Sequence, residues 1–263
     1  MRQRVFITGA ASGIGRELTR RLLAQGAQVA VFDIQGAHAA RQALCEALAL
    51  PADRVQAFEM DVRDAASVHR AFEAAAQLGL PDRVIHCAGI ISATAFADLP
   101  EDEFVRVITV NLIGTRHVAA AALPHLRPGS QLVLTASMAG LIGCYGYAAY
   151  GAAKHGVVGL ADVLRLEWAP RGIDVSVVCP PEVDTPMVAQ ERRVRPRATE
   201  AMKLMAGALT VEDAAQQILR GIQARRFLII PGQRAKLMWW VQRLTPRPLT
   251  NWFTAQLVRH VTR

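Results

Sequence analysis

Two side chains four residues apart, Tyr150 and Lys154, have the chemistry to move a proton. They lie in the segment 146–168, which is rich in alanine and carries apolar residues at helical spacing. Residues four apart project from one face of a helix, so we expect the phenol and the ammonium to lie together. An ammonium favours an ionised phenol, so the pair predicts a lowered tyrosine pKa and proton exchange with an alcohol oxygen. The alternative is a core tyrosine beside a surface lysine.

The elements that must position this pair alternate between short apolar runs and helical patterns. Strands that are apolar throughout, separated by helices, predict a parallel sheet covered on both faces. The fold class expected is therefore α/β, a Rossmann-type doubly wound parallel seven-stranded sheet with a C-terminal helical extension. We expect one domain over residues 1–232 and an extension over 233–263. The expected strands are 4–8, 28–33, 55–58, 83–87, 131–135, 174–179 and 227–230, and the expected helices after the first turn are 37–50, 65–78, 101–122, 146–168 and 212–224.

A glycine-rich turn follows the first strand, with the spacing G-x-x-x-G-x-G. Glycines between a strand and a helix let the backbone approach a pyrophosphate, whose charge the helix N-terminus favours. A plain tight turn is the alternative, but the strand before and the helix after favour phosphate binding. The residues expected to contact the cofactor here are Gly9, Ser12, Gly13, Ile14 and Gly15.

Asp33 ends the second strand, 18 residues after Gly15. At this distance a carboxylate meets the adenosine ribose hydroxyls, and it repels a 2′-phosphate. No basic residue directly precedes Gly13 or follows Asp33, and Arg16 is the one nearby cation. The sequence therefore favours NAD over NADP as the cofactor.

Two more polar residues lie at positions where they could take part in the reaction. Ser137 closes the strand 131–136, thirteen residues before Tyr150, at the carboxyl end where ligands of such sheets bind. Its hydroxyl could hold a substrate oxygen opposite the phenol, or it is simply a turn residue. Asn111 lies inside an apolar helical pattern, where its amide either serves the site or makes a satisfied buried hydrogen bond.

Taken together, these residues resemble the short-chain dehydrogenase/reductase family over nearly residues 4–230. The elements that match, in the family's order and spacing, are Thr8-Gly9-x-x-x-Gly13-x-Gly15, Asp61-Val62, Cys87-Ala88-Gly89, Asn111, Ser137, Tyr150-x-x-x-Lys154 and Cys179-Pro180-Pro181-x-Val183-x-Thr185.

The resemblance implies a role for each matching residue. Tyr150 would be the general acid/base, with Lys154 lowering its pKa and holding the nicotinamide ribose, and Ser137 would orient the carbonyl. Asn111 would anchor a water that links Lys154 to solvent. The remaining cofactor contacts would be Asp61 and Val62 near the adenine, Ala88 and Gly89 along the cofactor, and Pro180, Val183 and Thr185 at the carboxamide.

This chain departs from the family pattern at two positions. Cys87 stands where the family has an asparagine whose amide braces the sheet, and Pro181 stands where it has a glycine. Neither change removes a proton-transfer group. We therefore expect altered loop geometry with activity retained.

Composition limits the remaining classes of function. Hydrophobic residues make up 52% of the 263 and charged residues 20%, which suits a folded globule. We expect a cytoplasmic protein, because the start lacks the apolar run of a signal peptide and no segment approaches a membrane span. The four cysteines form no C-x-x-C and are expected to be reduced, and the seven histidines show no ligand spacing, so no metal is predicted.

Substrate choice would lie in the segment 186–209, which covers the substrate in this family. Methionines here suit an adaptable apolar pocket, and four arginines (Arg192, Arg193, Arg195, Arg197) could meet an anionic group. A mobile, solvated loop is the alternative. The pocket residues expected are Ser137, Met138, Tyr145, Tyr147, Tyr150 and Met187, with Ile90, Ser92 and Leu141 as further candidates.

The basic charge is concentrated near the C-terminus. Nine of the 30 Lys and Arg residues follow residue 213, with no Asp or Glu, so the first 213 residues carry 21 basic and 22 acidic groups. Two apolar helical stripes run through this tail, with three of the four tryptophans: Leu237, Trp240, Val241 and Leu244, then Leu249, Trp252, Phe253 and Leu257. Such helices predict peripheral contact with an anionic membrane, or packing on the body or on a neighbouring subunit. Charge alone would also suit nucleic acid, but no recognition motif supports it.

The function expected is an NAD-dependent oxidoreductase that interconverts a secondary alcohol and a ketone on a largely hydrophobic, sterol-, retinoid- or long-chain acyl-like substrate. One alternative is an NADPH-dependent 3-oxoacyl-type reductase, and another is a non-catalytic dinucleotide-binding sensor or scaffold. A sensor needs none of Ser137, Tyr150 and Lys154. Family members usually form dimers or tetramers through the helices that carry Asn111 and Tyr150, so a homo-oligomer is expected.

Overall fold

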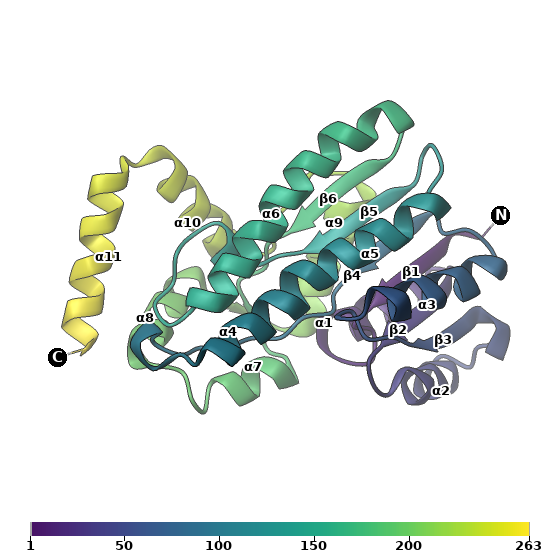
Figure 1. The fold of residues 1–263 in the computed structure, drawn as a ribbon, viewed down its shortest axis with the longest axis horizontal. Coiled ribbons are helices and arrows are strands. Elements are labelled where there is room, and N and C mark those ends of the chain that lie inside the picture. Colours follow the sequence, from purple (N-terminus) through teal and green to yellow (C-terminus); the bar gives the residue numbers. More distant parts are fainter. Residues whose placement is uncertain (1, 263) are drawn as a thin grey trace.

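The computed structural model describes residues 2–262 and contains a seven-stranded parallel sheet. The strand order is β3-β2-β1-β4-β5-β6-β9, so the expected doubly wound sheet is confirmed. Figure 1 shows the sheet and the helices along it. The strands are β1 (Arg4–Thr8), β2 (Gln28–Asp33), β3 (Val55–Glu59), β4 (Arg83–His86), β5 (Gln131–Thr135), β6 (Asp174–Val178) and β9 (Leu228–Ile229).

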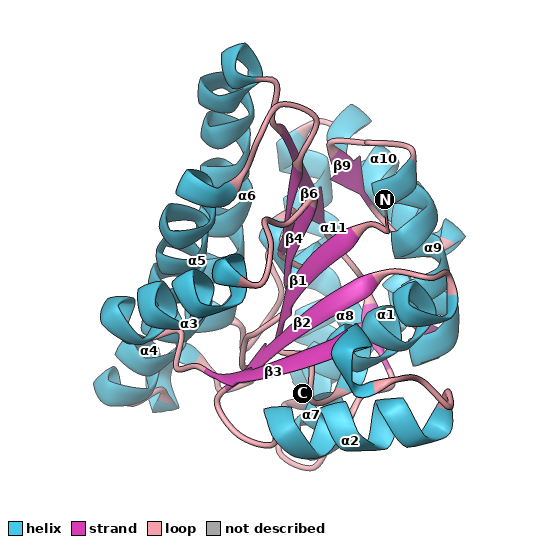
Figure 2. Cartoon of the chain, turned by 90° about the vertical axis from the view of Figure 1, so that its right-hand side faces the viewer, coloured by secondary structure: helices cyan, strands magenta, loops and turns pink. Residues whose placement is uncertain are grey.

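Helices cover both faces of this sheet (Figure 2). On one face lie α1 (Gly13–Ala24), α2 (Ala37–Ala47) and α9 (Val211–Gln223). On the other lie α3 (Ala65–Gln77), α4 (Glu101–Ile108), α5 (Gly114–Ala122) and α6 (Ala148–Trp168).

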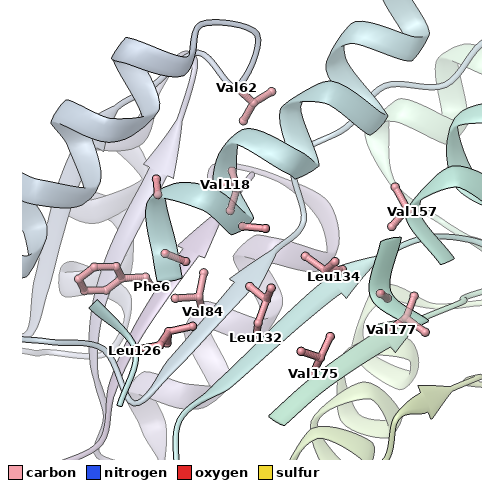
Figure 3. Packing of buried hydrophobic residues seen from close by; sticks show 14 of the residues in the cluster. Phe6, Val62, Val84, Val118, Leu126, Leu132, Leu134, Val157, Val175 and Val177 are labelled. Atoms are coloured by element: carbon pink, nitrogen blue, oxygen red, sulfur yellow. The ribbon is translucent and has the colours of Figure 1, made fainter. Parts of the chain in front are cut away.

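The strands are apolar on both sides because each side packs under helices. In β1, Phe6 belongs to the core beneath α3, α5 and α6, whereas its neighbour Ile7 belongs to the core beneath α1 and α9. Figure 3 shows the first of these cores, with Val84, Leu132 and Val175 on the strands, Val118 on α5 and Val157 on α6. Alternation along each strand thus builds two cores from one sheet.

The chain reverses its direction of winding around β1. It runs outward through β2 and β3, then returns to place β4 on the other side of β1. In such sheets the crevice at the reversal binds ligands at the carboxyl ends of the strands. The turns after β1 and β4 lie very close here: a Cβ on Gly9, whose φ is +66°, would lie 2.6 Å from the backbone nitrogen of Ala88. Glycine is therefore required at residue 9.

The expected helix 101–122 is interrupted at its centre. A π-helical turn, Thr109–Ile113, separates α4 from α5 and contains the buried Asn111. Single π turns inside α-helices frequently occur at functional sites. The helical stretch Glu101–His125 is the one helix in residues 2–262 that is long and apolar enough to cross a membrane, which the sequence analysis did not expect. It covers the core, with α5 packed against α3 and α4 against α6.

The segment 186–209 forms two helices rather than the loop that was the alternative. They are α7 (Pro186–Glu191) and α8 (Arg197–Ala206), flanked by a small two-stranded sheet of β7 (Glu182–Val183) and β8 (Ala208–Leu209). Beyond β9, the tail forms α10 (Gln233–Leu244) and α11 (Arg247–Thr262), and both pack against α8.

Candidate active site

A cavity of about 440 Å³ lies at the carboxyl ends of the central strands. Its volume is within the roughly 300–1,000 Å³ typical of small-molecule sites. Every residue expected to contact the cofactor lines this cavity: Gly9, Ser12, Gly13, Ile14, Gly15, Asp33, Asp61, Val62, Ala88, Gly89, Tyr150, Lys154, Pro180, Val183 and Thr185. The tertiary structure thus joins turns that are up to about 170 residues apart.

The glycine turn and the start of α1 form one end of the cavity. A Cβ on Gly15 would lie 2.1 Å from the carbonyl oxygen of Gly9, so the turn closes on itself too tightly for any side chain at residue 15. Ser12 is the N-cap of α1, but its side chain makes no capping hydrogen bond. The first amides of the helix are therefore free of a side-chain acceptor, which fits the binding of a phosphate.

Asp33 joins the end of β2 to the glycine turn. One of its carboxylate oxygens accepts the backbone N–H of Ala11 at 2.9 Å, and the other accepts the N–H of Ile34 at 2.9 Å. Arg63 also lines the cavity, but its guanidinium is paired with Asp61 at 2.6 Å. The side of the cavity next to the turn therefore presents a carboxylate fixed in place.

Tyr150, Lys154 and Ser137 meet in the middle of the cavity. Tyr150 and Lys154 are one turn apart on α6, and the lysine Nζ lies 5.7 Å from the centroid of the tyrosine ring. The Nζ also donates to the carbonyl oxygen of Thr135, the last residue of β5, at 2.9 Å. Ser137, two residues further on, lies near enough to Tyr150 for its hydroxyl to lower the pKa of the phenol, and it accepts the N–H of Ala139 at 3.1 Å. The end of β5 and the first turn of α6 thus position all three groups.

The expectation of a lowered pKa for Tyr150 is wrong. Burial raises the pKa of Tyr150 to about 12, against the hydrogen bond from Ser137, which lowers it. Burial also lowers the pKa of Lys154 to about 8. The lysine faces the ring and donates to Thr135, so desolvation of the phenol outweighs its attraction. At neutral pH the tyrosine is consequently protonated.

Asn111 does not line the cavity. It is fully buried, and its amide exchanges two hydrogen bonds of 2.9 Å with the backbone of Ile90. This is the satisfied buried hydrogen bond that the sequence allowed. A Cβ on Gly89 would lie 2.7 Å from the Asn111 Oδ1 and 3.5 Å from the Lys154 Nζ, so the amide and the ammonium approach the same glycine. A water-anchoring role of Asn111 remains a prediction.

His86 supplies the brace that Cys87 cannot. Its Nδ1 lies 2.6 Å from the Thr8 Oγ1 and its Nε2 lies 3.0 Å from the Thr115 Oγ1, so the ring joins β1, β4 and α5. The ring is buried, and desolvation lowers its pKa to about 3. The sequence analysis missed this role, although a histidine inside an otherwise apolar strand was a signal for it.

The substrate end of the cavity is largely apolar. Of the residues expected there, Ser137, Met138, Tyr147, Tyr150 and Met187 line the cavity, as does Ile90. Tyr145 was expected there but lines an adjoining pocket beside Phe96, which shares Gly143, Cys144 and Tyr147 with the cavity. Ser92 and Leu141 are also outside the cavity lining. Residues that line the cavity without having been expected include Ile142, Cys144, Lys203 and Met238.

A family model for short chain dehydrogenases matches residues 3–196. The chain belongs to the short-chain dehydrogenase family. A 3-dehydrosphinganine reductase of Arabidopsis thaliana is 33% identical over 230 residues, covering 86% of this chain and 68% of the relative. A 1-deoxy-11-beta-hydroxypentalenate dehydrogenase of Streptomyces avermitilis is 35% identical over 239 residues, covering 88% of this chain and 84% of the relative.

Solved structures of short-chain dehydrogenases have the same fold. One from Burkholderia cenocepacia in complex with NADP is 28% identical with a TM-score of 0.77, covering 89% of this chain and 98% of that chain. One from Burkholderia phymatum in complex with NAD has a TM-score of 0.79 at 24% identity, covering 92% of this chain and 93% of that chain. One of these two proteins thus binds NADP and the other NAD.

In this short-chain dehydrogenase, a buried ion cluster holds the segment that covers the substrate end. Glu182 of β7 pairs with Lys203 of α8 at 2.6 Å and with Arg195 at 2.7 Å, and also with Arg192. Glu191, at the end of α7, pairs with Lys203 at 3.0 Å and accepts the Tyr147 hydroxyl at 2.9 Å. Arg192 and Arg195 were expected to meet an anionic ligand. They are bonded to the protein's own carboxylates instead.

Proposed function

We propose that this short-chain dehydrogenase interconverts a secondary alcohol and a ketone on a largely hydrophobic substrate, with NAD as the hydride carrier. The observation that carries the proposal is the meeting of Tyr150, Ser137 and Lys154 in one cavity that also contains the glycine turn and Asp33. A general acid/base, a hydroxyl donor and a dinucleotide site are the parts that such a reaction needs.

The geometry supports a proton path through Tyr150. Bound nicotinamide supplies the hydride or accepts it. In ketone reduction, the substrate oxygen would accept hydrogen bonds from Ser137 and Tyr150, and the phenolic proton would pass to that oxygen. Lys154 then stabilises the phenolate, since its ammonium lies over the same ring. Alcohol oxidation runs the same proton transfer in reverse.

The choice of NAD is supported by Asp33. Its carboxylate is fixed by the Ala11 and Ile34 amides at the place where an adenosine ribose would lie, and a 2′-phosphate there would be repelled. Arg63, which also lines the cavity, is engaged with Asp61. Steady-state turnover with NADH and NADPH at equal concentrations tests the choice. A strong preference for NADPH would support the 3-oxoacyl-type reductase instead.

The proposed substrate is a long-chain or polycyclic lipid ketone or alcohol. Methionines on three helices support it, since Met187, Met202 and Met238 line the cavity and adapt to irregular apolar shapes. The likeness to a 3-dehydrosphinganine reductase adds long-chain amino ketones to the sterol-, retinoid- and acyl-like candidates. A panel of these ketones and alcohols, followed by nicotinamide absorbance, tests the class.

Replacement Tyr150→Phe separates the enzyme from a non-catalytic sensor. The variant should lose roughly 10²–10⁴-fold in kcat, because the phenolic proton is gone, while the dissociation constant for the dinucleotide changes little. Unchanged turnover in the variant would refute the assigned acid/base. Absence of turnover in the unmodified enzyme across the whole panel, with tight dinucleotide binding, would favour the sensor.

A homo-oligomer is also part of the proposal. Large apolar side chains are exposed on the outer faces of α4 and α6, which lie side by side: Val105, Val163 and Leu166. Pairing of two such faces would bury them. Sedimentation of the unmodified protein and of Leu166→Asp tests the interface, with dissociation of the variant as the expected result.

We place the enzyme in the cytoplasm with a peripheral contact to a membrane.

A further inference from the structure

The two tail helices turn their apolar stripes away from the protein. On α10, the side chains of Leu237, Trp240, Val241 and Leu244 are 50–76% exposed, whereas Ala235 on the opposite face is fully buried. On α11, Leu249, Trp252 and Phe253 are 47–61% exposed, whereas Thr250 is buried. The helices thus pack on the body through α8, as one of the alternatives allowed, while most of the apolar residues of their stripes stay exposed. Large apolar surface of this kind marks an interaction site.

The charges around these stripes are of one sign. The exposed ionic side chains of α10 and α11 are Arg234, Lys236, Arg243, Arg247 and Arg259, and the sequence from residue 214 onward contains no Asp or Glu. Figure 1 places α11 at the outer edge of the molecule, beside α8 and remote from β1–β3. Exposed tryptophans and leucines flanked by arginines suit the interface of a bilayer that contains anionic lipids.

The helix that carries this surface also forms part of the cavity wall. Met238 of α10 lines the cavity, while its neighbour Leu237 is exposed. The same holds for α8, where Met202 lines the cavity and Leu204 and Met205 are exposed. Because α8 packs against both α10 and α11, the exposed apolar side chains belong to one group of three helices.

We propose that α8, α10 and α11 form a docking surface for an anionic membrane, through which a lipid substrate passes from the bilayer into the cavity. The part that concerns substrate rests on the proposed function; the part that concerns binding does not. Apolar side chains of α10 and α11 insert among the lipids, and the arginines meet the phosphate and carboxylate headgroups. The substrate then leaves the bilayer next to α8 and α10 rather than crossing water.

Vesicle flotation with the full chain tests the docking surface. The protein should float with vesicles of phosphatidylcholine containing phosphatidylserine, and much less with phosphatidylcholine alone or at high salt. The double variant Trp240→Ser/Trp252→Ser should lose about tenfold or more in partition. Phe96→Ser is the matched control, since Phe96 is 77% exposed but lies outside these helices, and it should bind as the unmodified protein does.

Three outcomes would overturn the docking proposal. One is equal flotation of the unmodified protein and the double variant. Another is equal binding to charged and neutral vesicles, which would remove the role of the arginines. The third is a double variant that dissociates in sedimentation while its vesicle binding is intact, which would assign the surface to a second copy of this chain.

Kinetics with two forms of substrate test the passage of lipid. The double variant should lose kcat/KM for a long-chain ketone embedded in vesicles, and retain it for a short water-soluble ketone. Equal loss for both ketones, or for neither, would refute entry from the bilayer. If the unmodified protein binds vesicles but reduces no ketone, the proposed function fails while the docking surface stands.

Discussion

Protonation of His86 should set much of the acid sensitivity of this protein. The ring bridges Thr8 and Thr115 in the core, and its pKa falls from 6.5 to about 3, chiefly by desolvation. A depression of this size corresponds to about 5 kcal/mol in favour of the neutral ring in the folded state. Below about pH 6.5 the unfolded chain takes up a proton that the folded chain does not, so stability falls as the pH falls toward 3.

The replacement His86→Asn tests this linkage. Between about pH 8 and pH 5, protonation of this one residue in the unfolded chain should remove roughly 2 kcal/mol from the free energy of unfolding. The variant should be less stable at pH 8, by about 1–3 kcal/mol, because two buried hydroxyls lose a partner. It should, however, lose roughly 2 kcal/mol less than the unmodified protein on going to pH 5.

Urea unfolding followed by circular dichroism at a series of pH values measures both free energies. The exposed His38 provides a control, because His38→Asn removes a histidine without touching the core. Parallel pH profiles for the unmodified protein and His86→Asn would refute the reasoning, since they would mean that the buried ring contributes no proton linkage.

Three further predictions concern the site and its cover. Gly15→Ala should abolish dinucleotide binding measured by calorimetry, because the new Cβ would lie 2.1 Å from the Gly9 carbonyl oxygen, whereas Gly159→Ala, where nothing lies within 4 Å, should bind normally. Glu182→Gln should destabilise the ion cluster by about 3–5 kcal/mol, seen as faster hydrogen exchange in α7 and α8, because three cations lose a carboxylate partner. The control Glu200→Gln removes a carboxylate that is 55% exposed, so it should change hydrogen exchange in α7 and α8 little. Equal effects of Glu182→Gln and Glu200→Gln on hydrogen exchange would contradict the stabilising role of the buried cluster. Lys154→Met should lower kcat at neutral pH without unfolding the protein, and unaltered kcat would show that the ammonium does not assist Tyr150.

Local chemistry along the chain was enough to predict the elements and many of the residues that line the cavity. The apolar strands can be recognised because they alternate with helical patterns. The glycine turn can be recognised because a strand precedes it, a helix follows it and a carboxylate lies at a set distance from Gly15. In the structure these features bring Gly13, Asp33 and Thr185 to one cavity. The same is true of the pair on α6, whose four-residue spacing puts Tyr150 and Lys154 on one face.

The pKa of Tyr150 could not be predicted in this way. The sequence shows that a lysine is near, but not that its Nζ lies over the ring and bonds to Thr135, nor how far the phenol is desolvated. The position of the Lys154 Nζ and the desolvation of the phenol both depend on where β5 ends relative to α6. The same limit applies to Tyr145, since only the path of the turn before α6 decides which tyrosine faces the cavity.

The alternation of strands and helices, the glycine turn and the polar groups at strand ends could be predicted, because they follow from residue types at short spacings. How charges and apolar stripes are used depends on tertiary packing. Glu182 neutralises Arg192 and Arg195 of the covering segment from 10 and 13 residues away, a pairing that no local pattern reports, whereas Glu191 meets Arg195 at helical spacing. The direction in which α10 and α11 face is set by their packing on α8, and this leaves Trp240 and Trp252 in contact with solvent.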